Sequence, residues 1–232
     1  MVEWTPLSTA EVVQISATCL LAIVAFVAPY AVWRLQRRHL APRLRASYIH
    51  REPMARLSSR TVQGRGAGPA VFDFHFEVKN TGKTPAKNVV AEIIEFWHEA
   101  EPGKLVRLDE FMPVYLRYHQ TEFVDVHPER PYYWNIGDIY PRRLQRTWNK
   151  GALYDAPGKR GTGLRFRLDL HSAPHNQVNV LLKGTYGLKI ALYSENAKPA
   201  LLHLKLTWSG KWRASLQKML SEIVIQEAKT FR

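Results

Sequence analysis

Cysteine is nearly absent from this chain of 232 residues, which contains only Cys19. A single cysteine excludes an intramolecular disulfide framework and a cysteine-rich zinc site. Acidic residues are also few: 20 Asp and Glu stand against 33 Lys and Arg, which gives a formal net charge of +13 at pH 7. Apolar residues make up 46% of the chain, as in ordinary globular proteins, so wholesale disorder is excluded.

Sequence motifs that carry known chemistry are missing as well. No G-x-S-x-G, P-loop, G-x-G-x-x-G or H-E-x-x-H pattern occurs. The nine histidines are scattered, and Pro174 prevents a regular helix from placing His171 and His175 on one face. We therefore expect no catalytic residue, no metal ligand and no cofactor, and the sequence favours a protein that is not an enzyme.

One segment contains no charge at all. Residues 12–33 hold no Asp, Glu, Lys or Arg. At about 1.5 Å of rise per residue they reach about 33 Å, enough for a hydrocarbon core of about 30 Å. Tyr30 and Trp33 lie at the end of the segment, and aromatic residues favour the membrane interface. The sequence therefore predicts a transmembrane helix here rather than a buried core helix or a cleaved signal peptide.

Basic residues follow this segment at once. Residues 34–65 contain nine arginines and one acidic residue, whereas residues 1–33 contain no Lys or Arg. Because Lys and Arg near a span stay in the cytoplasm, we expect a bacterial inner-membrane protein with residues 1–11 outside and the remainder inside. The residues expected to lie against anionic lipid headgroups are Arg34, Arg37, Arg38, Arg43 and Arg45. The stretch contains a single aromatic residue, so nucleic acid is not an expected partner.

Small and weakly polar residues gather on one side of the expected span. At about 100° per residue, that side carries Gln14, Thr18, Ala22 and Ala25. The opposite side carries the bulkier Leu20, Ile23 and Val27. Small residues allow two helix backbones to approach closely in a membrane. The pattern predicts a homo-oligomer formed through this helix, with chance as the alternative because alanine is common here.

Alternation of apolar and polar residues dominates the chain after residue 70. In VFDFHFEV (71–78) the apolar side chains alternate with Asp73, His75 and Glu77, as in a half-buried strand. Further strands are expected at 88–98, 105–108, 114–118, 122–126, 132–136, 164–170, 178–182, 186–193 and 201–208. The pattern predicts a mainly β cytosolic domain over residues 69–210, an antiparallel sandwich or barrel.

Three segments lack this alternation. Residues 34–68 are expected to form a basic juxtamembrane segment and linker. Residues 141–163 are expected to form a long basic loop that is solvated, faces the membrane or collects phosphates. If the loop collects phosphates, the candidate ligand-binding residues are Arg142, Arg143, Arg146, Lys159 and Arg160. Residues 211–232 repeat apolar residues mostly at spacings of three and four, which predicts a C-terminal amphipathic helix.

Two segments resemble known proteins. The stretch VKNTGKTPAKNVV (78–90) places an Asn-x-Gly-x-x-Pro-Ala turn between two strands and resembles a hairpin of bacterial immunoglobulin-like domains. Residues 187–212 look like the late hairpin of uncharacterised bacterial single-pass membrane proteins that have a cytosolic immunoglobulin-like β-sandwich. The resemblance covers most of residues 70–212. It implies an immunoglobulin-like antiparallel sandwich behind one span, and it implies no activity and no functional residue.

Two functions remain open from the sequence. The first is a membrane-anchored, non-enzymatic binding or scaffold module that takes a protein partner. The second is a membrane effector of bacterial antiphage defence, whose β domain senses a cyclic nucleotide and whose helices assemble to disrupt the inner membrane. Both functions use the same anchor and β domain, and no ligand-binding motif separates them.

Overall fold

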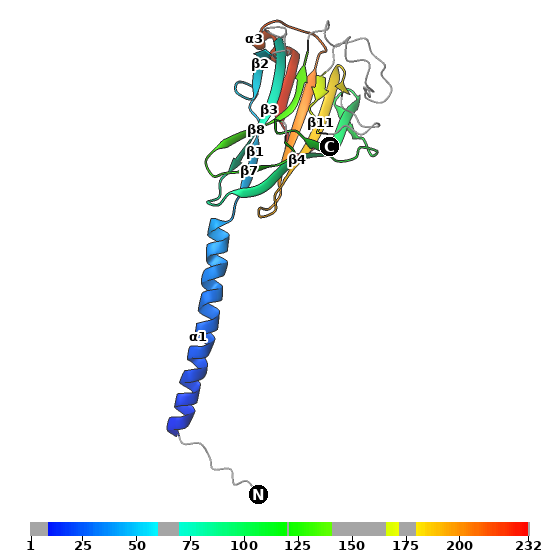
Figure 1. Cartoon of the computed structure of the whole chain (residues 1–232). Coiled ribbons are helices and arrows are strands. Elements are labelled where there is room, and N and C mark those ends of the chain that lie inside the picture. The colour runs from blue at the N-terminus through cyan, green and yellow to red at the C-terminus, as the bar shows by residue number, and fades with distance from the viewer. Residues whose placement is uncertain (1–8, 60–69, 120, 141–165, 172–179, 232) are drawn as a thin grey trace. The chain divides into compact units, whose positions relative to one another are not determined.

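The computed structural model describes residues 9–59, 70–119, 121–140, 166–171 and 180–231, apart from the side chains at 11, 12, 36–39 and 59. The chain divides into two compact units, residues 1–41 and 42–232. The first contains one apolar helix, and the second is built mainly of strands in two antiparallel sheets (Figure 1). The predicted fold class, a mainly β domain behind an N-terminal apolar helix, is confirmed.

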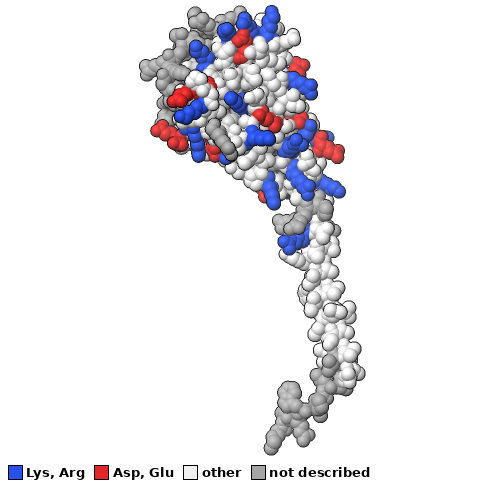
Figure 2. Space-filling view, turned by 180° about the vertical axis from the view of Figure 1, so that it is seen from behind, with Lys and Arg blue, Asp and Glu red and all other residues white. Residues whose placement is uncertain are grey.

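Helix α1 (Thr9–Leu40) contains the uncharged segment predicted to be a span. Its residues Val13–Leu35 have a mean hydropathy of 2.2, and none of their described side chains is buried against protein. The helix is therefore long and apolar enough to cross a membrane. It continues past the predicted end at residue 33 and through the first arginines. Figure 2 shows a long stretch of the described part of α1 without charged side chains, whereas both signs are interspersed over the β domain.

The β domain consists of two sheets. The first contains β1 (Leu44–Ser47), β2 (Ala55–Ser59), β3 (Ala70–Asn80), β8 (Pro131–Ile139), β9 (Phe166–Leu168) and β10 (Val180–Leu181). The second contains β4 (Ala86–Glu101), β5 (Lys104–Arg107), β6 (Val114–Leu116), β7 (Val124–Val126), β11 (Gly184–Tyr193), β12 (Ala200–Trp208) and β13 (Ile223–Glu227). The neighbour order is β1-β3-β8-β9-β10 in the first sheet, with β2 also beside β3, and β13-β12-β11-β4-β5 in the second, with β6 and β7 also beside β4.

The two sheets share one hydrophobic core, and the alternating segment in β3 forms part of it. Phe72, Phe74 and Phe76 are fully buried in a cluster with inward residues of both sheets. The ring of Phe76 stacks on Trp134 of β8, with centroids 6.2 Å apart. Burial of one such ring contributes about 1.5–3 kcal/mol. The opposite face of β3, which carries Asp73, faces away from this core.

The prediction of a linker over residues 34–68 is wrong for residues 42–59, which the structure describes as part of the β domain. The β domain begins at residue 42 rather than at 69, and β1 and β2 both pair with the same edge of β3. Tyr48, Met54 and Ala55 are buried in the shared core. The strands were hidden because they are short and interrupted by arginines. Such runs show too little alternation to be distinguished from a loop.

The C-terminal helix predicted over residues 211–232 is present but much shorter. Helix α3 covers only Leu216–Glu222, and the chain then continues as β13, which pairs with β12. Within β13, Ile223 and Ile225 are buried whereas Val224 is exposed. This segment has β-branched residues and a period of two, which are features of a strand. The apolar spacing read across the whole segment concealed the change of period.

A buried asparagine organises one end of the β domain. Asn80 is 2% exposed, and its side-chain oxygen accepts hydrogen bonds from the backbone N–H groups of Arg43 (3.0 Å) and Gly82 (2.9 Å). Its side-chain nitrogen donates to the carbonyl oxygens of Thr84 (2.7 Å) and Val126 (3.0 Å). An amide has two donor hydrogens and two acceptor sites, and all four are used here. Asn80 therefore fixes the entry to β1, the β3–β4 turn and the end of β7 relative to one another.

We predict that Asn80→Ala destabilises the β domain by about 3 kcal/mol, because it leaves buried backbone groups without partners. The matched control is Asn196→Ala. Asn196 is exposed, although it also bonds to backbone groups, through Lys87 N (2.9 Å) and Pro85 O (3.0 Å). The free energy of unfolding of both variants is measured by denaturant titration of the full chain in detergent, with tryptophan fluorescence as the signal. Equal losses in the two variants would contradict the central role of Asn80.

Candidate functional site

The outward face of the first sheet carries a row of four charged side chains. The strand register places Arg56 of β2 opposite Asp73 of β3, Asp73 opposite Asp138 of β8, and Asp138 opposite Arg167 of β9. The order across the sheet is therefore Arg-Asp-Asp-Arg. Like charges directly opposite each other in a sheet repel. Each aspartate in this row has an arginine on its other side, which offsets that repulsion.

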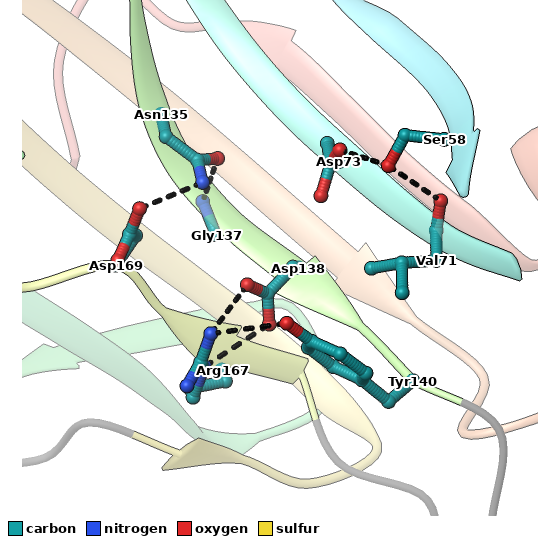
Figure 3. Close-up of polar contacts among 9 residues, drawn as sticks. All are labelled: Ser58, Val71, Asp73, Asn135, Gly137, Asp138, Tyr140, Arg167 and Asp169. Atoms are coloured by element: carbon teal, nitrogen blue, oxygen red, sulfur yellow. Dashed lines mark hydrogen bonds and ion pairs between the residues drawn. The ribbon is translucent and has the colours of Figure 1, made fainter. Parts of the chain in front are cut away.

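The Asp138–Arg167 pair is the more buried half of this row (Figure 3). The Asp138 carboxylate has no exposed side-chain surface, and it accepts hydrogen bonds from Arg167 Nε (3.1 Å) and Nη2 (2.7 Å). Arg167 Nη2 also donates to the Tyr140 hydroxyl at 3.3 Å. Burial lowers the pKa of Arg167, but the hydrogen bonds and charge of Asp138 outweigh it and raise the pKa above its ordinary value. Arg167 is therefore a permanently charged group held in a fixed orientation.

The Arg56–Asp73 pair is looser. Arg56 Nε lies 3.9 Å from Asp73 Oδ2, and the Arg56 side chain is 53% exposed while that of Asp73 is 6% exposed. The hydroxyl of Ser58 donates a hydrogen bond to the same Asp73 oxygen (Figure 3). An exposed pair at this distance contributes little to stability. Arg56 can therefore turn toward another anion at small cost.

A glycine lets the strands carrying the buried pair approach each other. Gly137 lies in β8, where a register shift interrupts the pairing with β3 between Phe74 and His75. A Cβ atom at Gly137 would lie 2.3 Å from the Arg167 carbonyl oxygen and 2.5 Å from Phe166 Cε1, distances that are too short for any side chain. The absence of a side chain thus permits the close β8–β9 contact that places Arg167 beside Asp138.

This face contains a hollow of about 770 Å³. The strands of the sheet contribute Arg56, Ser58, Asp73, His75, Tyr133, Asn135 and Arg167 to its lining. Asp169 directly follows β9, and Arg117, His119 and Thr121 come from the segment after β6. Asn135 Nδ2 donates to Asp169 Oδ2 at 2.8 Å, and Arg117 Nη2 donates to the His171 carbonyl at 3.1 Å. A volume of this size is within the range of small-molecule sites, about 300–1,000 Å³. The lining is polar and carries three arginines and two aspartates.

The basic loop predicted as a ligand site cannot be compared with this hollow. Its residues Arg142, Arg143, Arg146, Lys159 and Arg160 lie outside the described residues. Sequence reasoning placed Asp73 and His75 on the polar side of one strand and predicted another strand over residues 164–170, but it did not bring the two segments together. It missed Arg56 and Arg117 entirely. Arg56 was assigned to a linker, and no local pattern distinguishes Arg117 from other exposed arginines.

The other predicted site residues are exposed where they are described. Arg34 lies in α1, and Arg43 and Arg45 lie at the start of the β domain. Arg37 and Arg38 belong to α1, but their side chains are outside the described set. The predicted association residues Gln14, Thr18, Ala22 and Ala25 are exposed along α1. The Thr18 hydroxyl donates to the Gln14 carbonyl at 2.8 Å, so its hydrogen bond is satisfied within the helix.

No family model, curated protein or solved structure matches this chain. The resemblance to single-pass proteins with an immunoglobulin-like domain therefore stays a prediction. Among the described residues, no group of three or more His, Cys, Asp and Glu side chains could hold a metal ion. The hollow on the first sheet combines charge, polar groups and room for a ligand.

The two halves of the charged row should differ in their effect on stability. We predict that Arg167→Met destabilises the β domain by about 3 kcal/mol, because it leaves the buried Asp138 carboxylate without its guanidinium. Arg56→Met, the matched control, should cost less than about 1 kcal/mol, since Arg56 is exposed and its ion pair is long. Denaturant unfolding of the full chain in detergent measures both. A larger loss for Arg56→Met would show that the assignment of the two halves is reversed.

Proposed function

We propose that this chain is a membrane-anchored, non-enzymatic binding or scaffold module. Helix α1 is the anchor, and the β domain is the module. The observation that carries the proposal is the combination of α1 with a domain that has a separate core. Residues Val13–Leu35 present apolar side chains that no described protein surface covers, whereas the β domain buries its own apolar residues in one cluster. Contact between these apolar side chains and water is unfavourable, whereas the hydrocarbon core of a bilayer of matching thickness can surround them at no such cost.

The distribution of charge supports an orientation with the N-terminus outside and the β domain in the cytoplasm of a bacterium. Residues 1–33 contain no Lys or Arg, whereas exposed Arg34 comes directly after the uncharged segment 12–33, and exposed Arg43 and Arg45 lie at the start of the β domain. Lys and Arg close to a span are retained on the cytoplasmic side. These arginines also suit contact with the anionic headgroups of the cytoplasmic leaflet.

The strand order supports an immunoglobulin-like module. Taken in chain order, β1/β2, β3 and β8 match strands A, B and E in one sheet, and β4, β11 and β12 match strands C, F and G in the other. At the edge where constant-type domains place strand D, this chain has β9 and β10 instead. Domains of this architecture commonly bind partners through surface residues, which is an argument by analogy with the fold.

The alternative is the membrane effector whose β domain senses a cyclic nucleotide. The hollow on the first sheet supports this alternative, because it has the size and the basic groups that a nucleotide would need. The effector differs from the scaffold in one requirement. Its helices must assemble within the bilayer, and the small-residue side of α1 would provide the contact.

A reporter fusion tests the anchor and its orientation. We expect a reporter that is active only in the cytoplasm to be active when fused to the C-terminus in a bacterial host, and one that is active only in the periplasm to be inactive. The chain should remain in the membrane fraction after an alkaline wash. The control variant replaces Arg34, Arg37 and Arg38 with Gln, and should weaken the orientation without preventing insertion. Periplasmic activity of the unmodified fusion would overturn the proposed function.

A membrane two-hybrid assay separates the two functions. If α1 self-associates through its small residues, the double substitution Ala22→Leu and Ala25→Leu should weaken the signal, because the added bulk separates the helix backbones. Val27→Leu increases bulk on the opposite side and should leave the signal unchanged. A wild-type helix that does not associate would exclude the homo-oligomer and the effector, and would leave the scaffold function in place.

A further inference from the structure

We propose that the hollow on the first sheet binds a phosphate-bearing ligand of nucleotide size, and that Arg56 and Arg117 are the residues that contact its phosphate. The inference rests on the proposed function, because it names the ligand class that the binding module would take. It concerns residues that lie far apart in the sequence and are brought together only by the strand order.

Arg56 and Arg117 each have more N–H donors than the contacts with described residues use. A guanidinium has five N–H donors. Arg56 directs Nε toward Asp73 at 3.9 Å, which is too long for a hydrogen bond. Arg117 is exposed and uses Nη2 to hold the His171 carbonyl at 3.1 Å. Both side chains border the hollow. Each guanidinium can donate two hydrogen bonds to two oxygens of a phosphate.

The acidic groups of the hollow already have partners, which reduces their repulsion of an incoming anion. Asp73 accepts a hydrogen bond from Ser58 and lies in the ion pair with Arg56. Asp169 accepts from Asn135 at 2.8 Å. The lining has three arginines against these two aspartates, and the buried Asp138 balances the charge of Arg167. The preference for an anion therefore rests on the N–H donors of Arg56 and Arg117.

The size of the hollow favours a nucleotide over an inorganic phosphate ion. About 770 Å³ is much more than a single ion needs, and the phosphate-binding arginines occupy only part of the lining. The remaining lining offers the ring of Tyr133 and the polar groups of Asn135 and Asp169. An aromatic ring can stack on a base, and carboxylate and amide groups can bond to the edge of a base. Both are contacts that proteins commonly make with a base.

Arg167 has a different role from the other two arginines. Its Nε and Nη2 groups are used by the buried Asp138 carboxylate and the Tyr140 hydroxyl. It lines the hollow, and its charge is balanced by Asp138. Substitutions that test the ligand site must therefore avoid Arg167, because its loss would destabilise the sheet.

The test is calorimetric titration of the full chain in phosphatidylcholine nanodiscs. The nucleotide probes are ATP, 3′,5′-cyclic AMP and cyclic di-AMP. Adenosine provides a base without phosphate, and inositol 1,4,5-trisphosphate provides a lipid headgroup without a base. We expect at least one nucleotide to bind and adenosine and the headgroup not to bind.

Variants assign the binding to the hollow. Arg56→Gln and Arg117→Gln should each weaken nucleotide binding about tenfold or more, since each removes a charged hydrogen-bond donor. Arg56→Lys keeps the charge but cannot donate two parallel hydrogen bonds. Its nucleotide affinity should lie between that of the parent chain and that of Arg56→Gln. Lys198→Gln removes an exposed positive charge outside the hollow and should have no effect. The unfolding transition of each variant should match that of the parent, which shows that the loss is not one of folding.

Three results would overturn the inference: no nucleotide binds at millimolar concentration, the headgroup binds in place of nucleotides, or both glutamine variants bind nucleotide as well as the parent does. These outcomes differ from failure of the proposed function. A chain anchored with its β domain in the cytoplasm that binds no nucleotide refutes only the ligand assignment. A periplasmic β domain refutes the proposed function whatever the chain binds.

Discussion

The architecture of the β domain depends on the chain crossing from one sheet to the other directly after β3. The crossing needs a turn whose backbone polar groups are satisfied although one side of it is buried. Asn80 meets that need with four hydrogen bonds, two accepted and two donated. Because its partners include Arg43 and Val126, the same side chain also fixes where the domain begins and where β7 ends. An aspartate has the same size but lacks the two donors, and a serine has too few groups to replace both halves of the amide.

A second constraint acts on the outward face of the first sheet. Asp73 and Asp138 are opposite each other and almost fully buried, which is unfavourable for two carboxylates. Strand order supplies the flanking arginines, and Gly137 allows β9 to come close enough for Arg167 to bond to Asp138 through two groups. The result is a rigid half built on Arg167 and an adaptable half built on Arg56. A surface with that division suits ligand binding, because the fixed half positions the strands while the exposed half can exchange partners.

Much of the fold could be predicted from periodicity, and most of the site could not. The alternation at residues 71–78 reflects the pleat of one strand, so it identified the core face of β3 correctly. The strands β1 and β2 are too short for such a signal, and the spacing across residues 211–232 mixed a helical turn with a strand. The charged row depends on which strands are neighbours. Arg56 and Arg167 are separated by more than a hundred positions, and no local pattern indicates that β2, β3, β8 and β9 lie in one sheet in that order.

The same contacts bear on how a ligand could act on the rest of the chain. A ligand changes a conformation only to the extent that it binds one state more tightly than another. Its contacts in the hollow would reach β3 through Asp73, and β3 is bonded to β1, which follows α1 in sequence. Between them, Asn80 fixes the first residues of the domain by accepting from Arg43 N, and Thr81 N donates to the Arg43 carbonyl at 2.8 Å. These bonds hold the end of β3 and the start of the domain as one unit. Such stiffness opposes a large rearrangement between β3 and the start of the β domain.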